Sequence, residues 1–455
     1  MGRILIRNAT VLSMDADVGD FPSADILIVD DRIALVQPDI KTNDAEIIEA
    51  RDMIALPGLV NAHHHTWETG LRGIASDWAG TDYRDHMHHG MALQFEAGDN
   101  YTATLFGALA QIDGGTTTLF DWCHNLRDAE MADASIDALE ESGIRAVFGH
   151  GMAKPLPVAG AAPYWETPHS RAEIHRLRTG RLSSDERLVT LAMAILGPDL
   201  GTYDVACADL QLAREYKLMT SAHTWGRPGQ RRTPDGMLRL AAAGLLGPDH
   251  NLVHGNNLDD AELKTILDTG CSVTATPLAE MLTADRTASL GRVAAFGGRP
   301  SLGTDLAPHF SAAMLPVIRH AFLHQRETDN RKLAQQHRWP PTRHATSTRT
   351  ALEWGTLGGA RALRLDDRVG SLTPGKLADI VLLRTDGMHL HGVLPGGNPA
   401  HAVVMYAEQG DVDTVIIGGT IRKRAGRLCY PAASLDKLRG RLLASRERIM
   451  HGRHF

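Results

Sequence analysis

Residues that can bind a metal ion follow four short apolar segments of this 455-residue chain. His63 and His65 stand two positions apart at the end of the stretch PGLVNAHHH. His223 ends the stretch LMTSAH, His254 ends NLVH, and Asp305 ends SLGTD. Imidazole nitrogens and a carboxylate oxygen are ligands that Zn²⁺ and Fe²⁺ accept. The pattern predicts a site for one divalent metal ion, Zn²⁺ before Fe²⁺ or Mn²⁺.

The spacing of the first two histidines carries information of its own. Side chains alternate along a strand, so His63 and His65 can point to one centre, and His64 is expected to face the other way in a structural role. A bound metal turns water into a nucleophile near neutral pH. Asp305 can accept a proton from that water, and His254 can polarise the bond under attack. We therefore predict Asp305 and His254 as catalytic residues.

The middle of the chain must bring these residues together. Short β segments alternate there with helical patterns, which predicts a (β/α)8 TIM-type barrel whose active site lies where the strands end. The β segments are residues 56–62, 116–122, 146–151, 189–196, 219–224, 251–256, 272–276 and 300–305. The helical patterns are residues 101–112, 131–142, 205–216, 237–243 and 259–269. A doubly wound open sheet, the alternative, would need a glycine-rich phosphate turn after its first strand, where this chain has PGLVNAHHH.

Both ends of the chain have a different sequence pattern from the middle. Short alternating strands are expected at residues 4–9, 25–29, 32–37 and 45–49, and again at 379–383, 401–406 and 414–417. The pairs Asp30-Asp31 and Gly418-Gly419 are expected as hairpin turns. We predict a small β-sandwich built from residues 1–56 and 369–455, the latter with a C-terminal helix, around a barrel of residues 57–368. The segments 155–184 and 326–350 are expected to be long loops.

Composition excludes several classes of function. The net charge is −7, with 47 basic and 54 acidic residues, which disfavours a nucleic-acid or membrane-surface binder. No apolar run reaches the roughly 18 residues that a membrane-spanning helix needs. The four cysteines are scattered without a CxxC pair, as in reduced cytoplasmic proteins. The expected partner is therefore a small-molecule substrate, and the expected location is the cytoplasm.

Four segments of the chain resemble the amidohydrolase superfamily, in its branch of cytosine deaminase-like and triazine hydrolase-like enzymes. PGLVNAHHH resembles the strand-one motif PG-[FL]-[VI]-[ND]-x-H-x-H of that family, and NLVHG and SLGTD resemble its strand-six and strand-eight signatures. Residues 359–383, GARALRLDDRVGSLTPGKLADIVLL, resemble its return into the sandwich. The resemblance implies a barrel enzyme that hydrolyses C–N bonds other than peptide bonds, and it implies a homo-oligomer.

The resemblance also assigns roles at the metal. It implies one metal ion bound by His63, His65, His223 and Asp305, with His254 beside the water or the polarised substrate oxygen. Two-metal members carry a bridging lysine or glutamate at the end of strand four, where this chain reads LVTLAMAILGPDLG. A single metal is therefore expected.

One position departs from the family pattern. The deaminases of the family read H-x-x-E on strand five, and the glutamate moves protons to the ring nitrogen or the leaving amine. This chain has Gly226 at the glutamate position. Three interpretations stay open: hydrolysis of an amide, urea or amidine-type bond; deamination of an aminated heterocycle with a substitute acid; and a non-catalytic barrel. Glu68 and Glu280 are possible substitute acids.

Aromatic and polar residues near the strand ends predict the walls of the pocket. Trp67 and Trp225 lie two residues beyond metal ligands, and Trp122 ends the second strand. Aromatic rings of this kind often line apolar substrate pockets. We predict these three tryptophans, with Glu280 and His309, as substrate-binding residues.

Overall fold

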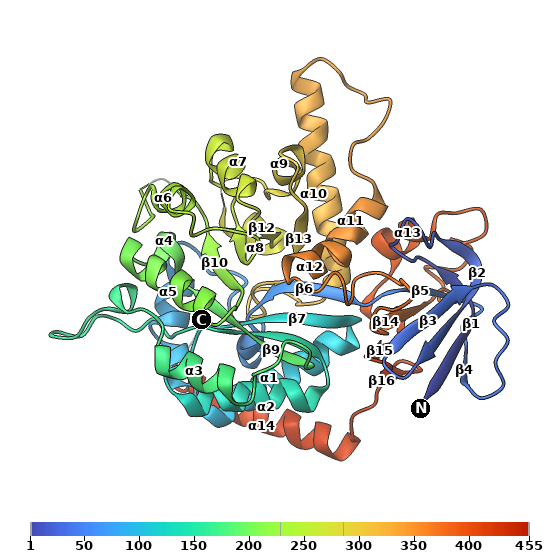
Figure 1. Cartoon of the computed structure of the whole chain (residues 1–455), viewed down its shortest axis with the longest axis horizontal. Helices are drawn as coiled ribbons and strands as arrows, with labels where there is room; N and C mark the ends of the chain where they lie inside the picture. The colour runs from blue at the N-terminus through green and yellow to red at the C-terminus, as the bar shows by residue number, and fades with distance from the viewer. Residues whose placement is uncertain (1, 228, 285, 454–455) are drawn as a thin grey trace. The chain divides into compact units, whose positions relative to one another are not determined.

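The computed structural model describes residues 2–227, 229–284 and 286–453, and these residues form two sheets (Figure 1). The chain divides into two compact units. One consists of residues 1–62, 109–118 and 313–431, and the other of residues 63–108, 119–312 and 432–455. The second unit contains the polar strand ends that the sequence singles out.

Eight strands form a barrel, as predicted. They are β6 (Leu59–His64), β7 (Thr116–Cys123), β8 (Arg145–His150), β9 (Val189–Ile195), β10 (Thr220–Thr224), β11 (His250–His254), β12 (Ser272–Ala275) and β13 (Pro300–Leu302). The sheet runs from β6 to β13 in sequence order, and the pairs from β8 to β13 are parallel. A bridge between His64 and Asp305 joins its first and last strands. The closed parallel order places all strand ends at one mouth.

A glycine allows this closure. A Cβ atom at Gly303 would lie 2.6 Å from the carbonyl oxygen of His63, so only glycine fits between the two strands. The backbone amide of Asp305 then donates to His63 O at 3.0 Å, and that of His65 donates to Asp305 O at 3.2 Å. The main chain itself therefore brings the residues of the first and eighth strands together.

The helices between the strands begin and end at residues suited to those positions. Asp128, Thr202 and Asp259 cap α2 (Ala129–Ser142), α5 (Tyr203–Glu215) and α7 (Asp260–Asp268) by accepting a backbone N–H. Helix α2 packs against β8 and β9, and α5 packs against β9 (Figure 1). The other helices of this unit are α3 (Arg171–Thr179), α4 (Gly197–Leu200), α6 (Gly236–Ala242), α8 (Pro277–Thr283) and α9 (Leu290–Ala295).

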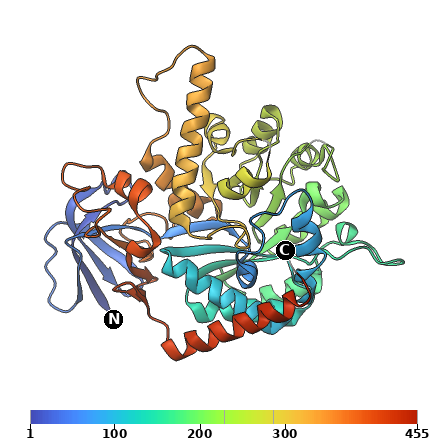
Figure 2. The same ribbon diagram turned by 180° about the vertical axis from the view of Figure 1, so that it is seen from behind.

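The C-terminal helix α14 (Ala432–Met450) also belongs to the second unit. It runs beside the first turns of α1 (Ala97–Asp113), as Figure 2 shows. Ser445 Oγ donates to Asp99 Oδ1 at 2.6 Å, and Arg448 pairs with the same carboxylate. Leu442 meets the short 3₁₀ helix Thr66–Leu71 that follows His65. This helix therefore supports the segment that leaves the first metal ligands.

The two chain ends form one mixed sheet of nine strands in the first unit. Its order is β17-β16-β15-β14-β5-β1-β2-β3, with β4 beside β1. The strands are β1 (Arg3–Val11), β2 (Phe21–Val29), β3 (Arg32–Gln37), β4 (Glu46–Glu49), β5 (Met53–Pro57), β14 (Ile380–Arg384), β15 (Val412–Ile417), β16 (Thr420–Arg424) and β17 (Arg427–Leu428). Both predicted hairpin turns are present, between β2 and β3 and between β15 and β16.

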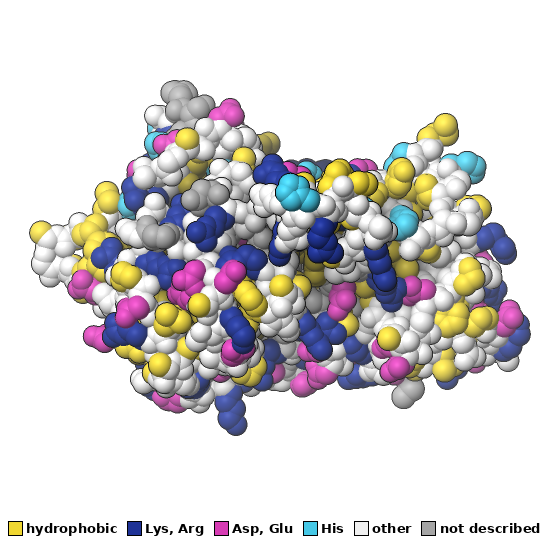
Figure 3. Space-filling model, turned by 90° about the horizontal axis from the view of Figure 1, so that it is seen from above, with side chains coloured by type: hydrophobic (Ala, Val, Ile, Leu, Met, Phe, Trp, Pro, Cys, Tyr) yellow, Lys and Arg dark blue, Asp and Glu magenta, His cyan; other side chains and the backbone are white. Residues whose placement is uncertain are grey.

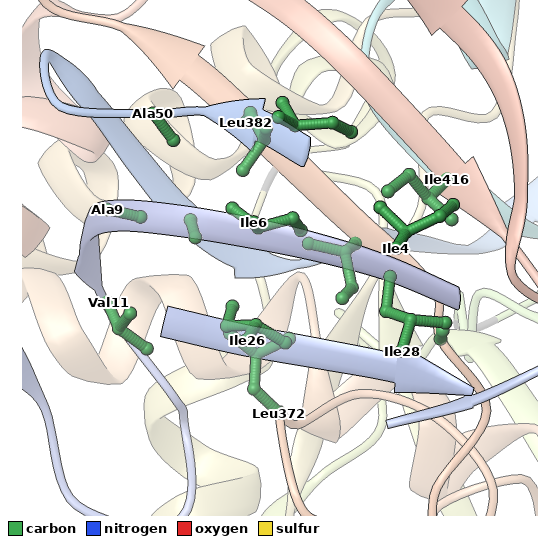
Figure 4. Packing of buried hydrophobic residues seen from close by; sticks show 14 of the residues in the cluster. Ile4, Ile6, Ala9, Val11, Ile26, Ile28, Ala50, Leu372, Leu382 and Ile416 are labelled. Carbon is green, nitrogen blue, oxygen red and sulfur yellow. The ribbon is translucent and has the colours of Figure 1, made fainter. Parts of the chain in front are cut away.

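Alternation along the strands gives this sheet two apolar faces. Ile4 and Ile6 of β1 pack with Ile26 and Ile28 of β2 in the larger cluster (Figure 4). Leu5, between them in sequence, packs on the other face with Leu27 and Ile40. The period of two is the pattern that identified these strands in the sequence. The predicted domain limits after residues 56 and 368 stay predictions.

Three predicted segments differ from the structure. Residues 401–406 were expected as a strand but form α13 (Pro399–His401) and the π-helix Ala402–Tyr406, because a short buried apolar run fits either geometry. The expected loop 326–350 begins inside α10 (Met314–Gln335) and ends inside α11 (Thr348–Trp354), followed by α12 (Leu357–Ala362). The expected loop 155–184 contains α3. The part of α10 beyond residue 325 has Leu333 and Ala334 as its only apolar residues, so it gives no apolar periodicity.

The surface agrees with the sequence-based exclusions that can be checked. Basic and acidic side chains are interspersed on the face drawn in Figure 3. Within the described part of the chain, no helix is both long and apolar enough to cross a bilayer. All four cysteines are free thiols.

Candidate metal centre

Four predicted ligands meet in one buried cluster at the mouth of the barrel. The ligand atoms of His63, His65, His223 and Asp305 all lie within 4.8 Å of one another. Asp305 Oδ1 is 3.1 Å from His63 Nε2 and 3.2 Å from His65 Nε2. Three imidazoles and one carboxylate around a common point are a donor set that Zn²⁺ accepts. The cluster fits a metal ion, and this part of the sequence prediction is confirmed.

The protonation states suit metal binding. Burial lowers the pKa of His63 to about 4 and that of His223 well below its usual value, which favours neutral rings. At His65 the hydrogen bond with Asp305 and nearby carboxylate charges outweigh burial and raise the pKa. Burial opposes ionisation of Asp305, but the hydrogen bonds with His63 and His65 outweigh it and hold its pKa well below the usual range. Neutral imidazoles and an ionised carboxylate are the forms that bind a metal.

A second layer of contacts fixes the direction of the ligands. His65 Nδ1 lies 2.8 Å from the carbonyl oxygen of Trp122, so it carries the proton and leaves Nε2 free to bind. The ring of His124 stacks on that of His65 at 3.9 Å. His64, between the two ligands, bonds instead to Asp305 O and Thr304 Oγ1, both at 3.0 Å from its Nδ1.

His254 stands beside the ligand cluster without joining it. Its Nε2 is 4.0 Å from Asp305 Oδ2, on the other side of the carboxylate from the oxygen that meets His63 and His65. Its Nδ1 is 2.9 Å from Thr276 Oγ1 and 3.4 Å from Glu280 Oε1. The backbone amide of Thr276 donates to the same Glu280 oxygen at 2.8 Å. Glu280 therefore orients His254 from behind, and Nε2 faces the cluster.

Two of these residues have backbone conformations that side chains seldom adopt. His254 has φ +78° and Asp305 has φ +58°, both in the left-handed region. Each such residue costs roughly 1–3 kcal/mol, which the surrounding fold must offset. Ser289 Oγ donates to the carbonyl of His254 at 2.7 Å, and the bridge to His64 holds Asp305. Strain of this kind concentrates at functional sites.

The position of the missing glutamate is closed. Gly226 has φ +71°, and a Cβ there would lie 2.6 Å from the backbone nitrogen of Leu258. The amide of Gly226 donates to Asp199 Oδ2 at 2.8 Å, and Arg231 donates to its carbonyl at 2.7 Å. Asp199, the acid nearest to the end of the fourth strand, is thus used to hold this turn. No larger side chain fits at position 226 without local movement.

The five residues predicted to bind substrate all lie in the second unit, and their roles stay predictions. The ring of Trp225 stacks on His254 at 3.7 Å, and Trp122 lies 4.3 Å from the ring of His223. Trp67 is fully buried and donates to His124 Nδ1 at 3.1 Å. His309 is buried with no partner for Nδ1.

Two further ionisable groups lie in this unit: Glu68, which the sequence suggests as a possible substitute acid, and Lys154, which the sequence did not place at the site. Glu68 is fully buried, and Tyr83 donates to its Oε1 at 2.5 Å. Lys154, after β8, is only 6% exposed, and its Nζ lies 5.7 Å from the centre of the Trp122 ring. Burial raises the pKa of Glu68 to about 7 and lowers that of Lys154 to about 7. The position of Lys154 directly after a barrel strand was the available signal.

The match to a family model decides the family. Residues 54–422 match the model of the amidohydrolase family. The chain belongs to the amidohydrolase family. As such it is a metal-dependent hydrolase of C–N bonds other than peptide bonds, as the sequence predicted. The non-catalytic interpretation is set aside with that result.

This amidohydrolase has near full-length relatives. It is 31% identical to the 5-methylthioadenosine/S-adenosylhomocysteine deaminase of Desulforudis audaxviator, over 94% of each chain. It is 30% identical to the 5'-deoxyadenosine deaminase of Methanothermobacter thermautotrophicus, over 93% of this chain and 94% of that one.

Solved structures share the fold of this amidohydrolase. An adenosine deaminase from Xanthomonas campestris with bound zinc matches with a TM-score of 0.82 and 22% identity, over 98% of each chain. A mutant of the atrazine chlorohydrolase TrzN from Arthrobacter aurescens TC1, complexed with zinc and atraton, matches with a TM-score of 0.81 and 23% identity, over 97% of this chain and all of that one.

Proposed function

We propose that this amidohydrolase is a zinc-dependent deaminase that removes an exocyclic amine from an aminated heterocycle, with adenosine-like compounds as substrates. One observation carries the proposal: the cluster of His63, His65, His223 and Asp305 lies in a chain about 30% identical, almost end to end, to deaminases of such compounds. The carbon that bears such an amine is of amidine type, one of the bond classes expected from the sequence.

Each residue of the site has a separate role in the proposed reaction. When bound, the Zn²⁺ ion would supply the Lewis acidity that makes water nucleophilic near neutral pH. Asp305 accepts a proton from the attacking water through its ionised carboxylate. His254 holds the oxygen that develops charge, through the Nε2 atom that faces Asp305. Thr276 and Glu280 keep that nitrogen in place from the other side of the ring.

The aromatic residues suit a flat substrate. Trp225 already stacks on the imidazole of His254, and Trp122 borders His223. A heterocycle that brings its amine-bearing carbon to the metal would have these rings close to its faces. Trp67 and His309 are proposed to form further parts of the pocket. This arrangement favours ring substrates over extended ones.

The test is the release of ammonia by the zinc-loaded protein. Adenosine, 5'-deoxyadenosine, methylthioadenosine and S-adenosylhomocysteine are incubated with the protein, and ammonia and the ultraviolet change of the purine are measured. We expect turnover of at least one compound, which is lost in Asp305→Asn. Zinc-loaded protein that leaves all four unchanged would count against the proposed substrates.

A second candidate is hydrolysis of an amide or urea bond. Gly226 favours it, because the residue that carries a proton to the ring in the family's deaminases has no counterpart at this position. A carboxylate product from N-acyl or ureido compounds, without ammonia from the purines, would favour this function. The metal identity, the expected homo-oligomer and the cytoplasmic location also stay predictions, the first two of which elemental analysis and light scattering can test.

A further inference from the structure

The proposed reaction needs an acid that the family motif no longer supplies. An amine leaves a tetrahedral carbon readily only when it is protonated. Gly226 cannot provide that proton, and the space around it admits no replacement. Glu280, Glu68 and Lys154 are three buried ionisable side chains that contact or interact electrostatically with His254 or a metal ligand.

The two carboxyl groups each use one oxygen to position a neighbour, and the other oxygen of each is buried without a partner. Glu280 lies behind His254, with Oε1 near Nδ1 of that ring and the amide of Thr276. Glu280 therefore affects the reaction through the imidazole of His254. Glu68 has one oxygen held by Tyr83, and its backbone amide donates to His65 O. These contacts anchor Glu68 to the segment that follows the metal ligands.

Lys154 is the cationic member of these three groups and interacts electrostatically with the Glu68 and Asp305 carboxylates. Its side chain is buried, and its Nζ has no hydrogen bond or ion pair to any described residue. The ammonium lies over the face of Trp122, and the same indole ring borders the ligand His223. A buried ammonium without a partner is unfavourable unless a ligand supplies one. The site thus keeps a proton donor ready beside the metal ligands.

We propose that Lys154 donates the proton to the leaving amine, in place of the absent glutamate; this inference rests on the proposed deamination. One N–H bond of the Lys154 ammonium breaks and an N–H bond forms on the leaving nitrogen. The C–N bond then breaks, its electron pair goes to nitrogen, and ammonia departs. Asp305 returns the proton it took from water to the neutral Lys154 amine. In the overall reaction, the substrate and water give the oxo product and ammonia.

The surroundings of Lys154 suit this role. Burial lowers its pKa to about 7, against the opposing effect of the Glu68 and Asp305 carboxylates. A general acid works best when its pKa is close to the working pH. The titratable groups that interact electrostatically with this ammonium lie at strand ends and on two short helical segments: Glu68, His88, His89, His124, His223 and Asp305.

The first test compares two leaving groups. Adenosine needs a protonated amine to depart, whereas chloride leaves 6-chloropurine riboside without a proton. We expect Lys154→Met to lower kcat for adenosine by roughly 10²–10⁴ and to change kcat for the chloro compound by only a few fold. Lys154→Arg, which keeps the charge but holds its proton, should behave like Lys154→Met. Lys264→Met removes an exposed lysine and serves as the matched control.

The outcomes separate the two proposals. Equal losses on both substrates overturn the role of Lys154, as does full activity of Lys154→Arg on adenosine. A zinc-loaded wild-type protein that hydrolyses neither compound refutes the deamination instead.

A second measurement does not depend on turnover. Lysines are reductively methylated with ¹³C-formaldehyde in the zinc-loaded protein, and the signal that disappears in Lys154→Met is titrated by NMR. We expect an apparent pKa clearly below the ordinary range for lysine, because the side chain is buried. A value above about 9, the ordinary range for lysine, overturns the proposal even if the enzyme deaminates purines. Elemental analysis must show unchanged zinc in every variant.

Discussion

Replacing Gly226 by alanine tests whether the chain can still accept a side chain where the family's deaminases have glutamate. The residue has φ +71°, and the new Cβ would lie 2.6 Å from Leu258 N, 2.9 Å from Leu258 Cδ2 and 2.9 Å from an Arg231 nitrogen. Gly244 offers a matched control, because it has φ +64° and nothing within 4 Å of the added atom. The two substitutions differ in crowding and share the backbone strain.

The expected loss of stability is the sum of the backbone strain and the crowding. A left-handed conformation costs a residue other than glycine roughly 1–2 kcal/mol, so both variants should lose about that much. Overpacking against a backbone atom that cannot swing away adds typically 1–3 kcal/mol, and this term applies to Gly226→Ala only. We expect Gly226→Ala to be less stable than Gly244→Ala by about 1–3 kcal/mol.

Urea unfolding followed by circular dichroism, with equal zinc in all samples, measures the difference. Equal loss of stability in the two variants would show that the turn at Gly226 is soft and that the crowding argument is wrong. In that case Gly226→Glu could restore the family's proton carrier. Our expectation is that Gly226→Glu lowers stability further and does not raise the rate of deamination.

Three further predictions follow from the site and the core. Dialysis against a chelator should lower the melting temperature, because zinc at 100 times its Kd stabilises the native state by about 2.7 kcal/mol. Elemental analysis of His63→Ala should show that this variant does not retain zinc. Thr276→Val removes a hydroxyl that contacts both His254 Nδ1 and, at 3.4 Å, Asp305 Oδ2, and it should lower kcat about 10–100-fold in protein shown to be loaded with zinc. Thr283→Val, at the end of the helix that follows Thr276, should not lower kcat, and equal effects would deny Thr276 a role in orientation. Burial lowers the pKa of His250 to about 4, so between about pH 6.5 and pH 4 the unfolded chain binds a proton at this ring that the folded protein does not bind, and the free energy of unfolding falls as the pH drops. His250→Asn should reduce the pH dependence of the free energy of unfolding in this range by about 1.4 kcal/mol per pH unit. An unchanged pH dependence would contradict the lowered pKa of His250.

The barrel was predictable because its strands are short, apolar and followed by polar residues. PGLVNAHHH combines a glycine, an apolar run and two imidazoles two positions apart. The apolar run predicts a buried strand, and the spacing places His63 and His65 on one face of it. The limits of that strand were less clear, because Leu56 and Pro57 belong to β5 of the other sheet. Gly58 separates the two strands, and a single sequence gives no reason to divide the run there.

The rest of the site could not be read from neighbouring residues. Lys154 stands in no motif, and Glu68, three residues after His65, was only one of two possible substitute acids. Their importance depends on burial and on partners that are present or missing, which only the fold decides. The role of Glu280 behind His254 has the same origin, because it depends on the turn after β12. Polar helices such as the end of α10 were missed because they lack an apolar stripe.

The left-handed backbone at His254 and Asp305 also bears on how this enzyme could be changed by directed evolution. Aspartate and asparagine tolerate this conformation better than branched or long residues. Libraries that vary these two positions would mostly yield proteins that fail to fold, whatever their chemistry. Diversity is better placed at positions with ordinary backbone angles, such as His309, where variants would test its proposed role in substrate binding while the main chain keeps the reactive groups aligned.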